Sequence, residues 1–478
     1  MNQNNDIGKM VPLVLDLDGT LLRTDSLWEM LCLELSAGSF GFIKALCGGK
    51  VALKKYLAER ARLSPEILPW NDDILALGRE AKKKGREVWL ATAACEIWAE
   101  KVAENFGFFS GVLATNEKNL KGEAKAAVLA EKFGLNGYDY AGDAFYDLPV
   151  WEKARAAYVV TDNKKLVAKA AKSNPNLTHI PCGDRAASAA LNALRPHQWA
   201  KNALLFTSFF LGHIFTLHAF LLCLLGFCLF CMVASSGYMI NDLLDLTADR
   251  RNPEKRFRPF AAGILPVSTG FLLASTLMAT AFILGALLLP PVFSVALIVY
   301  AVVTLLYSLR LKRIAILDVI ILSLLYVLRI AAGIFALSIQ LSLWIFIFSL
   351  FIFLALALCK RIAELRILAS IGMSFDKHRD YQPEDLHFLC ALSASAICAA
   401  TMTLALYVGD ALAFKYYVEP QWLLLFCPVL LFWLGRFILL AWRGKMKSDP
   451  VLFALKDKIS LACLGIGFIL YTLATLGV

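Results

Sequence analysis

Charged residues are scarce in this sequence of 478 residues: Asp, Glu, Lys and Arg make up 18% of it, whereas hydrophobic residues make up 59%. Soluble proteins average about 25% charged and roughly 45–50% apolar residues. The shortage of charge therefore excludes an ordinary soluble enzyme, a disordered chain, and a nucleic-acid-binding protein that relies on a basic surface. It indicates instead a protein with much of its chain in a membrane.

Two further features are missing. The 12 cysteines have neither the spacing of a zinc site nor that of a disulfide framework. The close pair Cys228 and Cys231 lies inside an apolar run, so we interpret the cysteines as packing residues. The first residues carry no basic stretch that leads into a long apolar run, and we therefore expect no cleaved signal peptide.

The composition changes near residue 185. Residues 1–185 carry a net charge of +1, and residues 186–478 carry a net charge of +9. In the first part, short apolar runs alternate with amphipathic stretches, which predicts an α/β domain with a parallel sheet. The apolar runs lie at 11–17, 88–91 and 138–141, and clear amphipathic stretches lie at 71–84 and 96–106. We expect an α/β domain at residues 1–183, a connector at 184–200 and an all-α membrane domain at 201–478.

Nine apolar runs of the second part are each near the ~20 residues that a helix needs to cross a bilayer. They lie at 201–217, 219–240, 269–288, 292–309, 316–337, 342–359, 388–408, 422–441 and 459–476. Every second connection is rich in Lys and Arg, at 250–258, 310–313, 360–379 and 443–458. Because such connections stay in the cytoplasm, we expect a multi-pass protein of the cytoplasmic (inner) membrane, with the α/β domain and the active sites on its cytoplasmic face.

Two carboxylates follow the first apolar run of the α/β domain, in the sequence Asp16-Leu17-Asp18-Gly19-Thr20. Residues two apart on an extended chain point the same way, and the carboxyl end of a parallel strand faces the ligand crevice. Such a pair can hold a hard cation through its oxygens and leave one carboxylate free for nucleophilic attack.

Three more elements follow in order: Thr92 at the end of the second apolar run, Lys121 before a helical stretch, and residues 142–147 after the third run. Together with the first motif they resemble the four motifs of the haloacid dehalogenase (HAD) phosphatase superfamily. The resemblance implies a HAD-like Rossmannoid fold and hydrolysis of a phosphate ester with Mg²⁺. It implies Asp16 as nucleophile, Asp18 as general acid and base, Thr92 and Lys121 as phosphate binders, and a metal site made by Asp16, Asp18, Asp143 and Asp147.

Three polar residues spaced by four end the second apolar run of the membrane domain: Asn241, Asp245 and Asp249. This spacing places them on one face of a helix, where they would repel one another at a membrane boundary. A divalent cation that bridges them to a diphosphate would remove the repulsion. The basic stretch 250–258 follows at once and suits a phosphorylated substrate.

Further charges accompany the later runs. Lys360 and Glu364 are four residues apart, with Arg361 on a neighbouring face, which fits either a binding cluster or a solvated face. Asp318 and Arg329 lie in the fifth run, about 16 Å apart along a helix. We interpret Arg329 as a binder of a lipid-linked phosphate, or alternatively as a structural partner of Asp318 or of a backbone carbonyl.

The pattern NDxxDxxxD at the end of an apolar run resembles the UbiA superfamily of intramembrane prenyltransferases. Residues 195–202, 241–263, 359–365 and 452–459 are similar to its decaprenyl-phosphate phosphoribosyltransferase branch. The resemblance implies a UbiA-like helical bundle and a Mg²⁺-dependent transfer of 5-phosphoribose from phosphoribosyl diphosphate (PRPP) to polyprenyl (decaprenyl) phosphate, for the arabinan of cell-wall arabinogalactan. It implies Asn241, Asp245 and Asp249 as the residues that hold Mg²⁺ and diphosphate, with Asn241 and Asp245 catalytic, and Lys201, Lys255, Arg256, Arg258, Lys360, Arg361 and Glu364 as substrate binders.

The two parts together suggest a bifunctional enzyme. Transfer leaves a 5′-phosphate on the lipid-linked sugar, and a phosphatase on the same membrane face would remove it to give polyprenylphosphoryl-ribose. Two alternatives stay open: a UbiA-type aromatic prenyltransferase with an attached phosphatase, and a lipid-binding scaffold with an inactive HAD module. Where aromatic prenyltransferases carry a second Asp-rich motif, residues 360–364 read KRIAE, which argues against a prenyl diphosphate donor. The sequence leaves the oligomeric state open, a homo-oligomer included.

Overall fold

The structure, a computed structural model, describes residues 10–116, 119–183, 186–340, 343–370, 380–446 and 450–477. Parts of two predicted basic connections, 371–379 and 447–449, lie outside the described residues. The chain divides into an α/β unit, formed by residues 1–194 and 238–274, and a helical unit, formed by residues 195–237 and 275–478. The predicted connector at 184–200 is thus shared between the units. Segment 238–274, where α11 ends and α13 begins, has most of its contacts with the α/β unit, although the sequence analysis expects it in the membrane domain.

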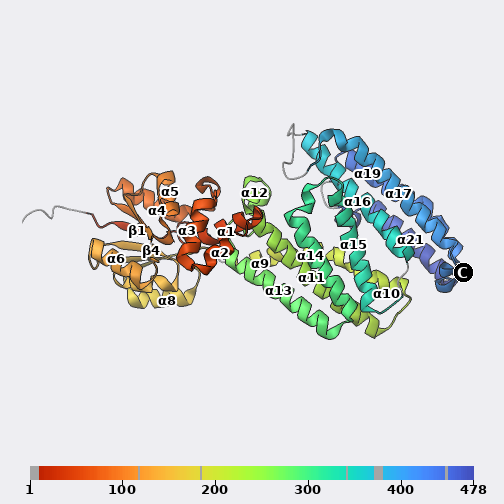
Figure 1. The fold of residues 1–478 in the computed structure, drawn as a ribbon, viewed down its shortest axis with the longest axis horizontal. Coiled ribbons are helices and arrows are strands. Elements are labelled where there is room, and N and C mark those ends of the chain that lie inside the picture. The colour runs from red at the N-terminus through yellow and green to blue at the C-terminus, as the bar shows by residue number, and fades with distance from the viewer. Residues whose placement is uncertain are drawn as a thin grey trace, which may run out of the picture. The chain divides into compact units, whose positions relative to one another are not determined.

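The α/β unit contains one sheet of six parallel strands in the order β3-β2-β1-β4-β5-β6 (Figure 1). The strands are β1 Leu13–Leu15, β2 Val88–Cys95, β3 Gly111–Thr115, β4 Asp139–Gly142, β5 Ala156–Val160 and β6 Leu177–Ile180. The predicted parallel α/β fold is confirmed. The sequence analysis identified β1, β2 and β4 but missed β3, β5 and β6, because so short an apolar run does not distinguish a strand from part of a helix.

Helices follow and separate the strands. In chain order they are α1 Ser26–Ser36, α2 Phe42–Cys47, α3 Lys50–Arg60, α4 Asp72–Lys83, α5 Glu96–Phe106, α6 Glu123–Phe133, α7 Leu148–Glu152, α8 Lys164–Ser173, α9 Ala186–Leu194 and α12 Leu246–Arg251, with short 3₁₀ helices η1 Pro65–Ile67, η2 Phe145–Asp147 and η4 Lys255–Phe257. The predicted helix at 71–84 is α4, which begins after Asn71, whose side chain accepts a hydrogen bond from the backbone N–H of Asp73 at 3.3 Å.

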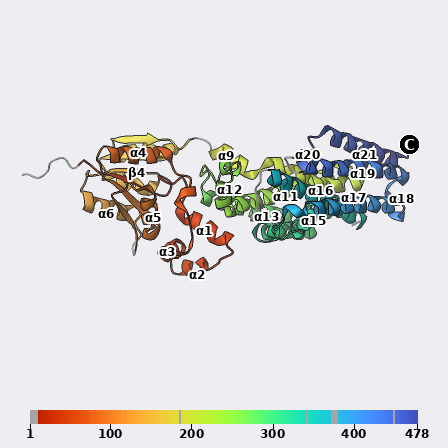
Figure 2. The same cartoon turned by 90° about the horizontal axis from the view of Figure 1, so that it is seen from above.

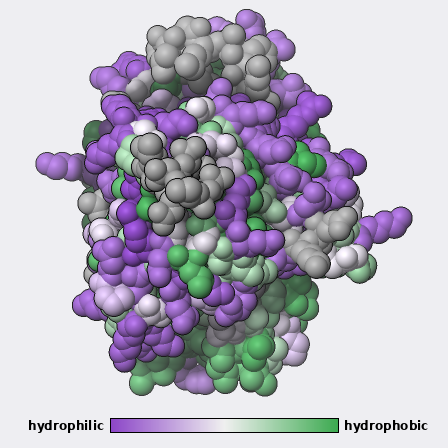
Figure 3. All heavy atoms as spheres, turned by 90° about the vertical axis from the view of Figure 1, so that its left-hand side faces the viewer, coloured by the Kyte–Doolittle hydropathy of each residue, from purple (hydrophilic) through white to green (hydrophobic). Residues whose placement is uncertain are grey.

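The helices cover both faces of the sheet (Figure 2). Leu13 and Leu15 of β1 pack on one face with residues of α3, α4 and α5, and Val14 packs on the other with residues of α6, α7 and α8. All three side chains are fully buried. Because both faces of a parallel sheet are covered, its central strand is a continuous apolar run. Figure 3 shows the opposite character on the outside of this unit, where most side chains are hydrophilic.

The described residues of the helical unit form helices and their connections. Its elements are η3 Pro196–Phe206, α10 Thr207–Leu211, α11 Leu217–Leu244, α13 Val267–Leu288, α14 Pro291–Leu309, η5 Leu311–Arg313, α15 Leu317–Ala336, α16 Leu343–Ser370, η6 Pro383–Asp385, α17 Leu386–Val408, α18 Ala411–Tyr416, η7 Pro420–Leu425, α19 Phe426–Trp442, α20 Pro450–Ala454 and α21 Lys458–Leu476. The last residues of α11 and the first residues of α13 belong to the α/β unit. Residues of α15, α16, α17 and α19 form the core of the helical unit.

Eight helices of the described part of the chain are long and apolar enough to cross a membrane, one fewer than the nine predicted. The first predicted span, 201–217, is instead divided between η3 and α10, and α10 ends at Leu211. His213 has φ of +51°, which a continuing helix cannot contain. The other eight predicted spans coincide with the eight helices. An all-α membrane region after an α/β region is therefore confirmed.

Candidate active sites

The first predicted site lies where β1 and β4 end side by side. The backbone N–H of Asp16 donates to the carbonyl of Ala141 at 3.0 Å, so the loop after β1 begins against the end of β4. Gly19 turns this loop with φ of +80°, and a side chain there would meet a carboxylate oxygen of Asp143 at 2.1 Å. Glycine at this position therefore allows the two acidic loops to approach each other.

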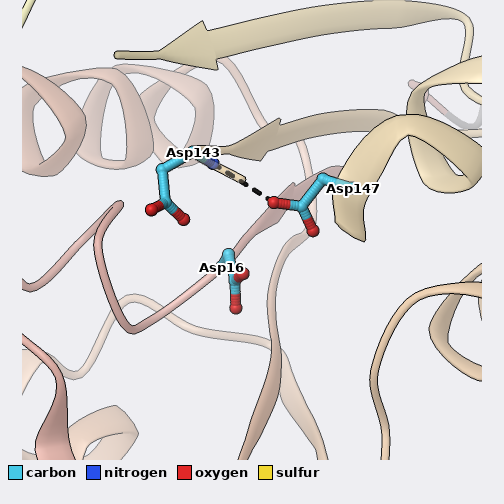
Figure 4. A group of neighbouring side chains, drawn as sticks. All are labelled: Asp16, Asp143 and Asp147. Atoms are coloured by element: carbon cyan, nitrogen blue, oxygen red, sulfur yellow. Dashed lines mark hydrogen bonds between the residues drawn. The ribbon is translucent and has the colours of Figure 1, made fainter. Parts of the chain in front are cut away.

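Three carboxylates share one small volume at this edge of the sheet (Figure 4). Asp16, Asp143 and Asp147 each offer an oxygen, and these oxygens lie within 4.8 Å of one another. The backbone N–H groups of Asp143 and Ala144 hold Asp147 in place by donating to one of its oxygens at 3.2 and 3.1 Å. Hard cations prefer carboxylate oxygens as ligands, so this donor set fits Mg²⁺.

A buried lysine that the sequence analysis did not single out completes this group. Lys125 of α6 is 2% exposed, and its Nζ lies 2.9 Å from Asp16 and 3.7 Å from Asp147. Lys121, which was predicted for this site, instead lies over the ring of Tyr146, with Nζ 3.6 Å from the ring centre. The two lysines are four residues apart in the sequence. No helical period relates them, because Lys121 lies before α6 and Gly122, between them, has φ of +60°. The signal in the sequence was a second lysine inside the helical stretch that follows Lys121.

Burial and the charges of neighbouring carboxylates favour protonation of Asp16 and Asp143. Burial raises the pKa of Asp16 to about 6, although the charge of Lys125 opposes the rise. Burial, followed by the charges of Asp147 and Asp16, raises the pKa of Asp143 well above its ordinary value. A bound divalent cation would offset this repulsion, which supports the fit of the site to Mg²⁺.

Asp18 is held by the first turn of α1. The backbone N–H and the hydroxyl of Ser26 donate to its two oxygens at 2.7 and 3.2 Å. Burial, and then the charge of Asp25, raise the pKa of Asp18 to about 8. A carboxyl group that keeps its proton near neutral pH can donate it to a leaving oxygen.

The four acidic residues and Lys125 line a cavity of about 370 Å³. Thr92, which is fully buried, also lines it, and its hydroxyl oxygen accepts a hydrogen bond from the backbone N–H of Ala94 at 3.0 Å. The hydroxyl proton of Thr92 stays available to a phosphate oxygen. An anionic substrate with a larger attached group suits the remaining lining, which includes Trp28, Trp98, Tyr146, Lys50, Lys54 and Lys121.

Mg²⁺ should bind this acidic group more tightly as the pH rises from about 6 to about 8. The pKa values of Asp16 and Asp18, about 6 and about 8, mean that protons compete with the cation below these values and leave above them. Calorimetric titration of the full chain carrying Asp245→Ala, which removes the second predicted Mg²⁺ site, would measure the affinity. An affinity that does not change over this pH range would contradict the expectation.

The second predicted acidic group lies at the end of α11. The backbone N–H of Asp245 donates to the carbonyl of Asn241 at 2.9 Å, and that of Asp249 donates to Asp245 at 2.8 Å. The spacing by four is thus kept, although Asp245 separates α11 from α12. Arg258, a predicted substrate binder, forms ion pairs with Asp249 at 2.7 Å and with Asp242 at 3.0 Å. Arg258 therefore holds carboxylates of the protein itself, and Asp242 is a member of this group that the sequence analysis did not identify.

The basic stretch after this group has both exposed and paired members. Lys255 and Arg256, in η4, are exposed, as residues that bind a soluble diphosphate would be. The side chain of Arg250 is only 4% exposed and donates to both oxygens of Glu29 at 2.9 and 2.6 Å. Glu29 lies in α1, three residues after Ser26. The helix that holds Asp18 is therefore also attached to the segment that follows Asp249.

In the helical unit, Arg361 has protein partners on several sides. Its side chain is 2% exposed and donates to Asp318 at 2.6 Å, and it also pairs with Glu364. Asp318 is fully buried and accepts a hydrogen bond from the hydroxyl of Tyr381 as well. Arg361, not Arg329, is thus the partner of Asp318. Lys360 is partly exposed.

Arg329 lies in a separate buried group. It donates to Asn202 at 2.8 Å, to the carbonyl of Leu325 at 2.7 Å and to the hydroxyl of Tyr300 at 2.7 Å. These partners are neutral, so they do not cancel its positive charge. The Arg329 guanidinium carbon and the buried Nζ of Lys201 lie 5.3 and 5.9 Å from the centre of the Tyr326 ring. The structure therefore brings together two of the predicted substrate-binding cations.

Comparisons with known proteins match the two parts of the chain to two different families. The model of the UbiA prenyltransferase family matches residues 203–464, and the model of haloacid dehalogenase-like hydrolases matches residues 48–152. The uncharacterized protein y4nM of Sinorhizobium fredii is 38% identical over 463 residues, which are 95% of this chain and 89% of that protein. Nodulation protein NoeC of Azorhizobium caulinodans is 33% identical over 58% of this chain and 92% of its own length.

A decaprenyl-phosphate phosphoribosyltransferase, from Corynebacterium glutamicum, is 34% identical over 229 residues, which are 47% of this chain and 68% of that protein. Both family resemblances predicted from the sequence are thereby confirmed. The UbiA match covers more than half of the residues, and the hydrolase match contains Thr92, Lys125 and the second acidic loop of the first site. The chain therefore belongs to the UbiA prenyltransferase family, is related within it to decaprenyl-phosphate phosphoribosyltransferase, and carries a haloacid dehalogenase-like hydrolase domain before its membrane region.

Proposed function

We propose that this protein transfers 5-phosphoribose from PRPP to a polyprenyl phosphate such as decaprenyl phosphate, and then removes the 5′-phosphate to give polyprenylphosphoryl-ribose. The similarity of the membrane region to decaprenyl-phosphate phosphoribosyltransferase carries the first step. The group of Asp16, Asp143, Asp147 and Lys125 supports the second step, because it has the components of phosphate-ester hydrolysis. The product would feed a reaction that uses lipid-linked pentose, such as the synthesis of cell-wall arabinan in arabinogalactan.

In the transfer step, a phosphate oxygen of the lipid attacks the anomeric carbon of PRPP. The bond from that carbon to the diphosphate oxygen breaks, and diphosphate leaves with the bonding electrons. The lipid phosphate is already ionised, so the step needs orientation and charge neutralisation more than a base. Asn241, Asp245 and Asp249 would hold the Mg²⁺ that neutralises the diphosphate. PRPP would be bound by Lys255, Arg256, Lys360, Arg361 and Glu364. The lipid phosphate would be bound by Lys201 and Arg329.

In the hydrolysis step, a carboxylate oxygen of Asp16 attacks the phosphorus of the 5′-phosphate. The bond between phosphorus and the ribose oxygen breaks, and Asp18 donates its proton to that oxygen. Water then attacks the phosphorus of the aspartyl phosphate, and Asp18 takes a proton from it. The bond between phosphorus and the Asp16 oxygen breaks, which restores the Asp16 carboxylate and releases inorganic phosphate. Thr92 and Lys125 would hold the phosphate oxygens, and Mg²⁺ bound to Asp143 and Asp147 would neutralise their charge.

Both steps would occur on the cytoplasmic face of the inner membrane, where PRPP is available. The basic connections support a cytoplasmic position of 250–258, because such connections stay in the cytoplasm. The ion pair between Arg250 and Glu29 supports the same side for the phosphatase site.

Incubation of the purified full chain with Mg²⁺, labelled PRPP and decaprenyl phosphate should yield a labelled lipid, measured by thin-layer chromatography. Asp245→Ala should lower this yield by about 100-fold or more, because the diphosphate would leave without its neutralising cation. Asp380→Ala, at an exposed position in the connection after α16, is the matched control and should retain transfer. Labelled lipid formed equally by Asp245→Ala would exclude the mechanism.

The same assay separates the alternatives. If PRPP yields no labelled lipid, the trial is repeated with a prenyl diphosphate and aromatic acceptors, and product formation there would identify an aromatic prenyltransferase. Absence of turnover with either donor, together with unchanged lipid binding by Asp245→Ala, would favour a scaffold.

A further inference from the structure

One short helix of the α/β unit presents apolar side chains outward. Phe40, Ile43 and Leu46, on α2 and just before it, are 59, 54 and 57% exposed. Their spacing by three places Ile43 and Leu46 on one side of the helix. Phe42 and Ala45 lie on the other side and pack against the hydrophobic core of the unit. α2 is therefore apolar on both sides: one side packs against the unit, and the other is exposed.

Lysines surround this outer face. Between Leu35 and Ala58 the chain contains four lysines and neither Asp nor Glu. Three of them, Lys44, Lys50 and Lys55, are exposed. Apolar side chains flanked by lysines are typical of segments that lie in a membrane interface, because anionic headgroups attract the lysines. The same charge disfavours pairing with α2 of a second copy, since like charges would meet.

Contacts within the α/β unit place the neighbouring helix α1 at the start of a membrane span. The rings of Trp28 in α1 and Phe271 in α13 lie 5.6 Å apart. Phe271 is in the second turn of α13, which is long and apolar enough to cross a membrane. Beyond Glu29 and its ion pair with Arg250, α1 continues for only about 10 Å before it ends. Figure 2 shows α1, α2 and α3 as one group, with α2 at its outer end.

We propose that α2 is a membrane-surface anchor. Phe40, Ile43 and Leu46 insert into the interfacial layer of the bilayer that contains α13, and the three exposed lysines contact anionic headgroups. The anchor has a consequence for the phosphatase site, because Lys50 and Lys54 of α3 line its cavity directly after α2. It holds the wall of this cavity at the membrane surface, where a lipid-linked phosphate lies.

Spin labelling of the full chain in lipid nanodiscs that contain phosphatidylglycerol tests the anchor directly. A label at Ile43→Cys, in a chain without other cysteines, should collide with oxygen more often and with a water-soluble nickel complex less often than a control label. The control is Leu135→Cys, which is 70% exposed in the same unit on the loop after α6. Equal nickel accessibility at the two positions would overturn the proposal. Dipolar coupling between two labels at position 43 would also overturn it, because a second copy would then cover the face.

An activity measurement tests the consequence, which rests on the proposed substrate. Ile43→Glu combined with Leu46→Glu should slow phosphate release from lipid-linked phosphoribose by about tenfold or more, because the site loses its local concentration of lipid. Hydrolysis of p-nitrophenyl phosphate should stay unchanged, as should both activities in Leu135→Glu. Equal loss with both substrates would show that α2 only supports the fold. The labelling result needs no substrate, so failure of the anchor and failure of the proposed function are distinguishable.

Discussion

An Asp16→Asn variant should transfer phosphoribose normally but release almost no phosphate from the lipid-linked sugar. The amide keeps the shape of the side chain and removes the carboxylate that attacks phosphorus. Loss of a covalent nucleophile costs at least about 10³-fold in rate. Chromatography of the labelled products should therefore show the phosphorylated lipid accumulating. Dephosphorylated lipid formed at the original rate would exclude Asp16 as the nucleophile.

Two lysine variants provide the matched comparison. Lys125→Met removes the cation that lies 2.9 Å from Asp16, and we expect phosphate release to fall by about 100-fold or more. Lys121→Met removes another cation of the same cavity, but this cation lies over the ring of Tyr146. The fall in phosphate release should therefore be smaller. Equal losses in the two variants would mean that proximity to Asp16 does not decide the contribution of a lysine.

An Arg361→Met variant should be strongly destabilised. The substitution leaves the fully buried carboxylate of Asp318 without its cation, and breaking a buried ion pair costs about 3–5 kcal/mol. Thermal unfolding of the purified protein in detergent would measure the loss. Arg366→Met, on the same helix but exposed, is the control and should unfold close to the original temperature.

A double variant separates stability from binding. Arg361→Met together with Asp318→Leu removes both charges, and replacing both partners of a buried pair by apolar residues is often close to neutral. The double variant should therefore regain much of the lost stability. If Arg361 also binds substrate, transfer should stay low although the fold is restored. A double variant as unstable as Arg361→Met would show that the ion pair is not the source of the effect.

Much of the architecture was predictable because it depends on local patterns. Hydrophobic length alone located eight helices that can span a membrane, and the apolar run before Asp16 located the central strand. The run at 201–217 was wrongly predicted as a span. The length of an apolar run gives no information on backbone angles, and the positive φ at His213 lies just after the end of α10. The strands β3, β5 and β6 were missed because their pairing, rather than their sequence, makes them strands.

Residue order was enough to predict the chemical groups: acidic residues at the ends of strands, a spacing by four after the second apolar run, and two family resemblances. Motif spacing carries this information because a family keeps its reacting groups in order along the chain. Which charges pair with one another became known from the fold. Asp16 forms its ion pair with Lys125 rather than Lys121. Asp318 pairs with Arg361 rather than Arg329, and Asp249 pairs with Arg258. A buried charge needs a partner within a few ångströms, and packing between distant segments, not spacing along the chain, supplies that partner.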